Sequence, residues 1–216
     1  TSRILLLFFI IFTLIFMSYY LYNTPGTNVY NAIHHKSNPL PILGNPGHHT
    51  RPFSFINQEG QTITEKEVEG KIRVVEYFFT TCKGICPRMN YNLKSVYDQL
   101  KDEPDFLLLS HTCDPETDSV QQLKKYTDSL GIDTRKWIFL TGRKDSLYNM
   151  ARLSYTIDDP ANNVKSIEDD FLHTQFWALV DRNGDVIRIY DGLEDREVQG
   201  LVKDVRKLLA DGTNFK

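Results

Sequence analysis

Short apolar runs alternate with amphipathic segments from residue 72 onward, and this alternation constrains the fold more than any other feature of the chain. Residues 72–79, 106–109 and 137–140 are rich in β-branched, aromatic and aliphatic side chains, which is typical of buried strands. Residues 88–101 and 117–130 lie between them and carry apolar side chains at helical spacing. A strand–helix–strand–helix–strand order predicts a layered α/β domain.

The flanking segments complete this pattern. Residues 53–64 and 175–190 each form a predicted hairpin, the second around an Asn-Gly turn, and residues 144–153 and 194–209 are predicted helices. We therefore expect a thioredoxin-like layered sandwich with a mixed central sheet. The loops that follow its parallel strands should meet at one sheet edge and carry the function.

An apolar segment precedes this domain. Residues 4–22 contain no charged side chain and match the length of about 20 residues that crosses a bilayer core. The run ends in tyrosines and lacks a small-residue cleavage pattern, which favours an uncleaved transmembrane anchor over a signal peptide. Arg3 is the only charge before it, so the positive-inside rule places the soluble part outside the cytoplasm.

The predicted organisation is an anchor at residues 1–22, an irregular tether at 23–50 and the thioredoxin-like domain at 51–213. The tether is rich in Pro, Asn and Gly, and its histidine pairs are expected to be incidental. The predicted location is the inner, cytoplasmic membrane of a cell, crossed once. The chain has 25 Lys and Arg against 28 Asp and Glu and no basic cluster, so no nucleic-acid partner is expected.

Two cysteines at a predicted strand–helix junction carry the chemistry. Cys82 and Cys86 are four positions apart, and Pro87 suits the first helical turn. Their spacing allows the two sulfurs to share a metal or to close a disulfide. The helix N-terminus should favour the thiolate and lower the thiol pKa. A structural disulfide is the plainer alternative, but so short a loop removes little unfolded-state entropy.

The motif Cys82-Lys83-Gly84-Ile85-Cys86-Pro87 resembles the CxxxCP motif of the Sco/SenC family, copper proteins of cytochrome c oxidase assembly. Two further motifs agree with this resemblance. The segment at 114–119, DPETDS, is similar to the family's DPExDT loop, and His173 precedes a hairpin similar to the family's FxLVDxxG pattern. The resemblance covers roughly residues 50–210, with the motifs in the expected order.

The resemblance implies one copper ion bound through Cys82, Cys86 and His173. Soft thiolates select Cu(I), and an added imidazole gives a site that can also hold Cu(II), although zinc could use the same ligands. Without the resemblance, His173 would more simply be a hydrogen-bonded histidine. Asp114 is expected either to tune the site from behind the ligands or to cap the following helix.

Cys113 departs from the family pattern, because the family does not usually place a cysteine before the acidic loop. Cys113 could lie close to the copper pair and form a wrong disulfide or an extra ligand. The simpler interpretation, which we favour, is a small buried apolar side chain at a strand end, with His111 on the same strand face.

The resemblance implies two functions. The first is a copper chaperone that receives copper from an upstream donor and delivers it to the CuA-bearing subunit of cytochrome c oxidase. The alternative is a thiol–disulfide reductase, with Cys82 and Cys86 as its redox pair, that keeps the cysteines of the oxidase copper site reduced. A peroxidase on the same fold would need a proline ahead of Thr80-Thr81-Cys82 that this chain lacks.

Overall fold

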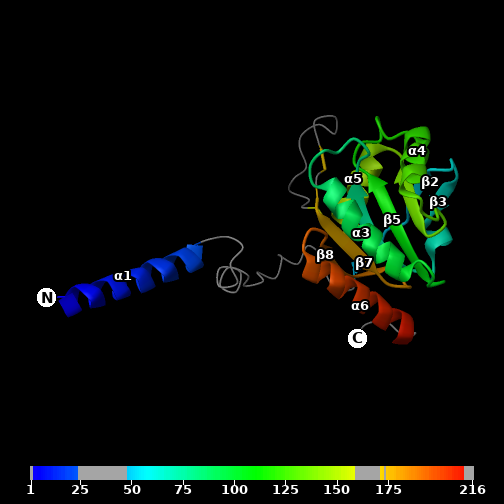
Figure 1. The fold of residues 1–216 in the computed structure, drawn as a ribbon. Coiled ribbons are helices and arrows are strands. Elements are labelled where there is room, and N and C mark those ends of the chain that lie inside the picture. The colour runs from blue at the N-terminus through cyan, green and yellow to red at the C-terminus, as the bar shows by residue number, and fades with distance from the viewer. Residues whose placement is uncertain (1, 24–47, 159–170, 173, 212–216) are drawn as a thin grey trace. The chain divides into compact units, whose positions relative to one another are not determined.

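The computed structural model describes residues 2–23, 48–158, 171–172 and 174–211. The chain divides into two compact units, Thr1–Ile42 and Leu43–Lys216. Figure 1 shows the helix of the first unit and the layered α/β arrangement of the second. The second unit contains every element that the alternation of strands and helices predicts.

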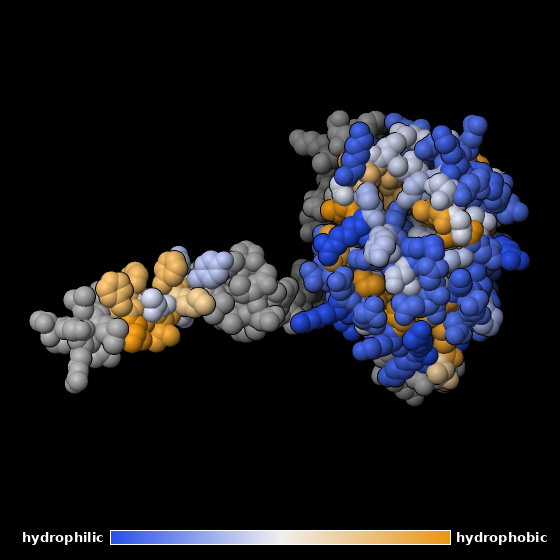
Figure 2. All heavy atoms as spheres, in the orientation of Figure 1, coloured by the Kyte–Doolittle hydropathy of each residue, from blue (hydrophilic) through white to orange (hydrophobic). Residues whose placement is uncertain are grey.

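In the first unit, helix α1 spans Ser2–Asn23. Its side chains from Phe9 to Tyr20 are exposed, and Figure 2 shows that most of them are apolar. Among the described residues, no helix combines the length and the apolar character that crossing a membrane requires.

The second unit is built on one eight-stranded sheet with the order β1-β8-β7-β4-β5-β6-β2-β3. The strands are β1 (His48–His49), β2 (Ser54–Asn57), β3 (Thr62–Thr64), β4 (Ile72–Phe78), β5 (Phe106–Thr112), β6 (Trp137–Thr141), β7 (Phe176–Val180) and β8 (Asp185–Asp191). Strands β4, β5 and β6 are parallel, and the other pairs are antiparallel. The sheet is therefore mixed, as the sequence predicts.

Helices cover both faces of this sheet. The helical elements are η1 (Glu65–Val68), α3 (Cys86–Leu100), α4 (Val120–Leu130), α5 (Lys144–Leu153) and α6 (Asp195–Asp211). Helices α3, α4 and α6 pack on one face around Trp137 and Trp177, and α3 and α6 lie side by side (Figure 1). Helix α5 covers the other face around Tyr77 and Tyr148. The parallel strands are thus buried on both sides.

Three boundaries differ from the sequence prediction. Strand β5 continues past Leu109 through Ser110, His111 and Thr112, all fully buried. Hydrogen bonds from the Ser110 and Thr112 hydroxyls to the buried carboxyl groups of Glu76 and Asp118 allow polar residues to extend the strand. Helix α4 begins at Val120 rather than at 117, because Ser119 caps it by accepting a hydrogen bond from the Gln122 backbone N–H.

The third boundary is at the start of the sheet. His48 and His49 pair with β8, within the range expected to be tether. A His48 ring nitrogen hydrogen-bonds to the Leu153 carbonyl at 2.9 Å, and His49 Nδ1 lies 2.9 Å from the Asp185 carboxylate. The histidine pair therefore has a structural role as an edge strand.

Candidate metal centre

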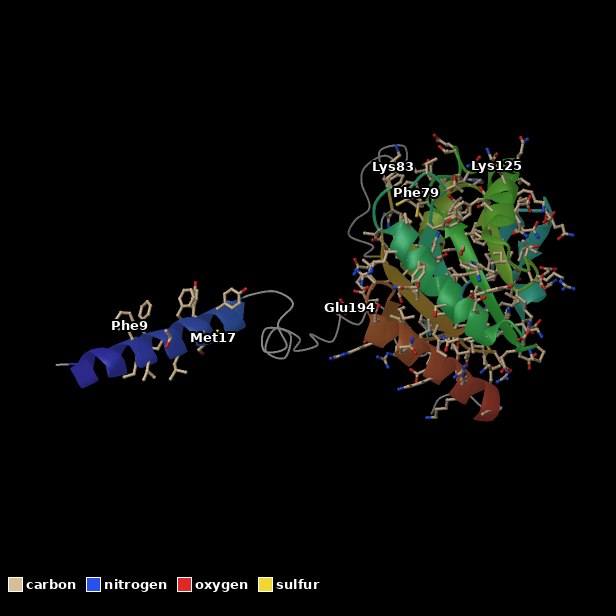
Figure 3. All side chains as sticks on the ribbon, in the orientation of Figure 1. Phe9, Met17, Phe79, Lys83, Lys125 and Glu194 are labelled. Atoms are coloured by element: carbon tan, nitrogen blue, oxygen red, sulfur yellow. The ribbon has the colours of Figure 1, made fainter. Side chains whose placement is uncertain are left out.

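The two cysteines of the motif lie where β4 ends and α3 begins. Phe78 is the last residue of β4, Cys82 lies in the following loop and is half-buried, and Cys86 is the first residue of α3 and only 5% exposed. Figure 3 labels Phe79 and Lys83 at this end of the domain. Pro87 occupies the first turn of α3, where a missing N–H leaves no intrahelical bond unmade.

The two thiols influence each other across the loop. Cys82 and Cys86 are both free, and the Cys82 side chain helps to raise the pKa of the Cys86 thiol. The loop, rather than a continuous helix, brings them together, because α3 begins only at Cys86. One sulfur is accessible to an incoming partner while the other is enclosed. This arrangement suits either two-sulfur metal binding or disulfide formation.

The prediction of a lowered thiol pKa is wrong for Cys86. Burial, reinforced by the hydrogen bond and charge interaction with Cys82, raises the pKa of the Cys86 thiol to about 12. A hydrogen bond from the Phe79 backbone opposes this shift but does not reverse it. In the metal-free protein the buried thiol is thus protonated at neutral pH, and binding of a metal releases its proton.

A buried carboxyl group lies behind the cysteine pair on the same face of the sheet as α3. Glu76, in β4, is fully buried and accepts a hydrogen bond of 2.5 Å from the Ser110 hydroxyl, which in turn accepts one from the Trp137 indole. Its second oxygen has no hydrogen-bond partner among the described residues. Burial raises the pKa of Glu76 to about 8, so the neutral acid dominates at neutral pH. Glu76 also contributes to the raised pKa of Cys86.

A second buried carboxylate holds the cysteine loop in place. Asp118 is fully buried and accepts hydrogen bonds from the Thr80 backbone N–H at 3.1 Å, the Thr80 hydroxyl at 2.5 Å and the Thr112 hydroxyl at 2.6 Å. Gln122 also donates to the Thr80 hydroxyl, at 3.1 Å. Asp118 therefore ties the loop two residues before Cys82 to the end of β5.

Asp114, the residue expected near the site, forms hydrogen bonds within its own loop. Its carboxylate lies 3.4 Å from the Thr117 backbone N–H, and its carbonyl accepts from the Asp118 N–H at 2.8 Å. These bonds shape the turn that presents Asp118 to Thr80. Sequence reasoning chose the first aspartate of DPETDS, whereas the last one contacts the cysteine loop. No pattern in the sequence singles out Asp118, because its bond to Thr80 forms only in the fold.

The third cysteine lies on the other face of β5. Cys113 is 2% exposed within the apolar cluster beneath α5, and burial raises the pKa of its thiol well above the usual value. Its backbone N–H donates to the Phe78 carbonyl and its carbonyl accepts from the Tyr148 hydroxyl, each at 2.7 Å. These contacts support the interpretation of Cys113 as a small buried side chain.

His111 is also fully buried, and four aromatic rings surround it: Phe53, Phe55, Tyr77 and Tyr155. Neither of its ring nitrogens has a hydrogen-bond partner among the described residues. Burial lowers the pKa of His111 to about 3, so the ring is neutral.

His173, the predicted third ligand, lies outside the described residues. On either side of it, Leu172 is buried and the Thr174 hydroxyl donates to the Ile157 carbonyl at 2.7 Å. Within the described part of the chain, no three His, Cys, Asp or Glu side chains are grouped so as to hold a metal ion. The described geometry thus brings together Cys82 and Cys86, while the copper ligand set of Cys82, Cys86 and His173 stays a prediction.

The fold and the paired cysteines define a thioredoxin-like protein with a Cys-x-x-x-Cys site at its strand–helix junction. The family model described as SCO1/SenC matches residues 43–210. The chain therefore belongs to the SCO1/SenC family.

Curated relatives agree with this assignment. The chain is 30% identical over 159 residues to the SCO1 protein homolog of Bacillus subtilis, an alignment that covers 72% of this chain and 80% of the relative. It is 29% identical over 162 residues to the mitochondrial SCO1 homolog 1 of Arabidopsis thaliana, covering 72% of this chain but 47% of that longer protein.

Solved structures show the same fold. The structure of BsSco, described as a member of the Sco family of cytochrome c oxidase assembly proteins with a disulfide switch, has 29% identity and a TM-score of 0.64, over 77% of this chain and 97% of its own. Arabidopsis thaliana ScoI, solved with copper bound, has 29% identity and a TM-score of 0.58, over 73% of this chain and 98% of its own.

Proposed function

We propose that this chain is a copper chaperone that binds one copper ion through Cys82, Cys86 and His173 and delivers it to the CuA site of cytochrome c oxidase. The observation that carries the proposal is the placement of a half-buried and a buried thiol at the mouth of α3, close enough for Cys82 to raise the pKa of Cys86. Soft sulfur ligands of this kind favour Cu(I). Family membership and the copper-bound Arabidopsis relative support copper as the cargo.

Delivery requires a site that a partner can reach and a ligand that can leave. The exposure of Cys82 supports approach by a partner, and the enclosure of Cys86 supports retention of the metal until then. The proposed partners are an upstream copper donor and the CuA-bearing subunit of the oxidase. BsSco, described as belonging to the oxidase assembly proteins, supports the second partner.

A thiol–disulfide reductase is the second candidate, because the same two thiols could reduce a target disulfide. Cys82, the more exposed thiol, would attack a target sulfur as thiolate and form a mixed disulfide. Cys86 would then displace the reduced target, which leaves a Cys82–Cys86 disulfide. The disulfide switch described for BsSco favours keeping this candidate.

The substitution His173→Ala separates the two functions. The chaperone predicts about a tenfold or greater loss of copper affinity, because two sulfurs alone would hold the ion. It also predicts an unchanged rate at which the metal-free dithiol reduces a small disulfide. Anaerobic competition with a Cu(I) chelator and a thiol-exchange assay measure the two effects on the same sample. Copper affinity that survives the substitution would favour the reductase.

We also propose that residues 4–22 anchor the protein in the membrane, with the copper domain outside the cytoplasm. The uncharged run and its helical conformation in α1 support this proposal. Full-length protein should stay in the membrane fraction after alkaline carbonate extraction, and a chain that begins at residue 26 should be released. Release of both forms would argue against the anchor.

A further inference from the structure

An arginine is buried at the end of β4 that lies away from the cysteines. Arg73, the second residue of β4, is only 4% exposed, and its Nη1 donates to the Val68 carbonyl at 3.0 Å. No carboxylate of the described residues lies within ion-pair distance of it. Arginine is rarely buried without such a partner, because removing its charge from water is costly.

Burial lowers the pKa of the Arg73 guanidinium, and the charge interactions with Tyr155 and Asp181 oppose this shift only in part. Among the described residues, the Arg73 guanidinium donates one hydrogen bond, to Val68, so most of its N–H donors are unused. A guanidinium carries five N–H donors in a planar fork that matches two oxygens of a carboxylate or phosphate.

Arg73 lines a pocket of about 340 Å³. Its Nη2 converges with the Thr50 hydroxyl and the His49 ring on Gly184, where a Cβ atom would lie 3.4, 3.2 and 3.2 Å from these groups. Gly184 has φ +91°, so the turn favours glycine, and the missing side chain also keeps the space open. The Thr50 hydroxyl has no hydrogen-bond partner among the described residues, so it can donate into the pocket.

The wall of the pocket carries charges of both signs. Lys66 and Arg182 add two cations to Arg73, whereas Glu65 and Glu69 add two carboxylates. Glu65 already accepts a hydrogen bond from the Phe53 backbone N–H, at 3.2 Å. The formal sum of these five lining groups is one positive charge, before any contribution from His49. The buried Asp181 carboxylate, whose charge acts on Arg73, lies outside this lining and offsets that charge, and Arg182 is already paired with Asp105. The unused N–H donors of Arg73, rather than the net charge of the wall, therefore favour an anion.

We propose that this pocket binds a small oxyanion, a phosphate or a carboxylate, with the Arg73 guanidinium and the Thr50 hydroxyl as donors and Lys66 as a charge at the rim. The anion would supply the charge partner that the buried guanidinium lacks. The site lies at the opposite end of β4 from Cys82, so it does not depend on the proposed copper function.

Inorganic phosphate and acetate, each compared with chloride at equal ionic strength, test this proposal on the metal-free protein. A ligand that binds only the folded state at about five times its Kd should raise Tm by about 2–4 °C. Arg73→Met should abolish the shift and Lys66→Ala should reduce it. Lys101→Ala, an exposed lysine outside the pocket, should keep it.

An amide NMR titration of the wild-type protein gives the same answer if Arg73→Met does not fold. The Thr50 and Gly184 amides should shift with the anion, and the Cys82 and Gly84 amides should not. A response to phosphate alone or to acetate alone narrows the ligand to that class. The proposal fails if neither anion acts beyond chloride, if Lys66→Ala and Lys101→Ala respond alike, or if the amide shifts lie elsewhere.

Discussion

Asp118→Ala is expected to lower the free energy of unfolding by about 3 kcal/mol, because it removes a buried carboxylate that accepts three hydrogen bonds, one buried and two part-buried. The Thr80 N–H and the Thr80 and Thr112 hydroxyls would lose their partner. Because Thr80 is two residues before Cys82, the cysteine loop would also lose its tie to β5. Copper affinity should fall about tenfold, as is usual when a group that orients a ligand is lost.

Two further variants make this test specific. Asp114→Ala is the matched control from the same loop, because its carboxylate has only a 3.4 Å contact with the Thr117 N–H. It should change stability and copper affinity little. The stability and copper affinity of Asp118→Asn should lie between those of the two alanine variants, because an amide offers one acceptor oxygen in place of two. Urea unfolding, the Cys82–Cys86 reduction potential and copper competition are the measurements. Equal effects of Asp118→Ala and Asp114→Ala would contradict the positioning role of Asp118.

Glu76 is expected to make the protein less stable as the pH rises. Its pKa is raised from 4.5 to about 8 by burial, so between these values the folded state holds a proton that the unfolded state has released. Stability is then greatest below the lower value and falls until the pH reaches the upper one. The loss is at most about 5 kcal/mol, at about 1.4 kcal/mol for each pH unit.

Glu76→Gln should remove this part of the pH dependence, since an amide does not titrate. Its absolute stability is a poor readout, because the amide N–H groups would be buried where Glu76 Oε2 has no partner. The direct readout is the slope of the unfolding free energy against pH, measured in reducing buffer between about pH 5 and 8. Glu116→Gln, an exposed control, should keep the wild-type slope. A Glu76→Gln slope equal to that of the wild type would contradict the assignment.

The order of strands and helices could be predicted from the sequence because it rests on apolar periodicity, which burial imposes directly. Strand β5 was predicted too short, since Ser110 and Thr112 are polar and only their tertiary hydrogen bonds allow burial. Pairing of His48 and His49 with β8 was missed for a similar reason, because two residues give no period.

The cysteine pair could be predicted because its spacing and its strand–helix setting are local. The raised pKa of Cys86 could not, since it arises chiefly from burial in the folded domain, which the spacing of the motif does not show. The role of Asp118 could not be predicted, because only the fold shows that this aspartate reaches Thr80, while the role of Asp114 near the metal stays a prediction. The sequence did not indicate the pocket at Arg73 either, because a single cation within an apolar run does not show which groups surround it.

The most direct test of the copper site is an anaerobic Cu(I) titration of the soluble domain beside its Cys82→Ser, Cys86→Ser, His173→Ala and Cys113→Ser variants. Cys113→Ser is the matched cysteine control, since this thiol is buried in the cluster beneath α5. If Cys82, Cys86 and His173 hold the copper ion, the wild type and Cys113→Ser should each bind one ion tightly. The other three variants should bind copper more weakly. Equal binding by all five proteins would contradict it.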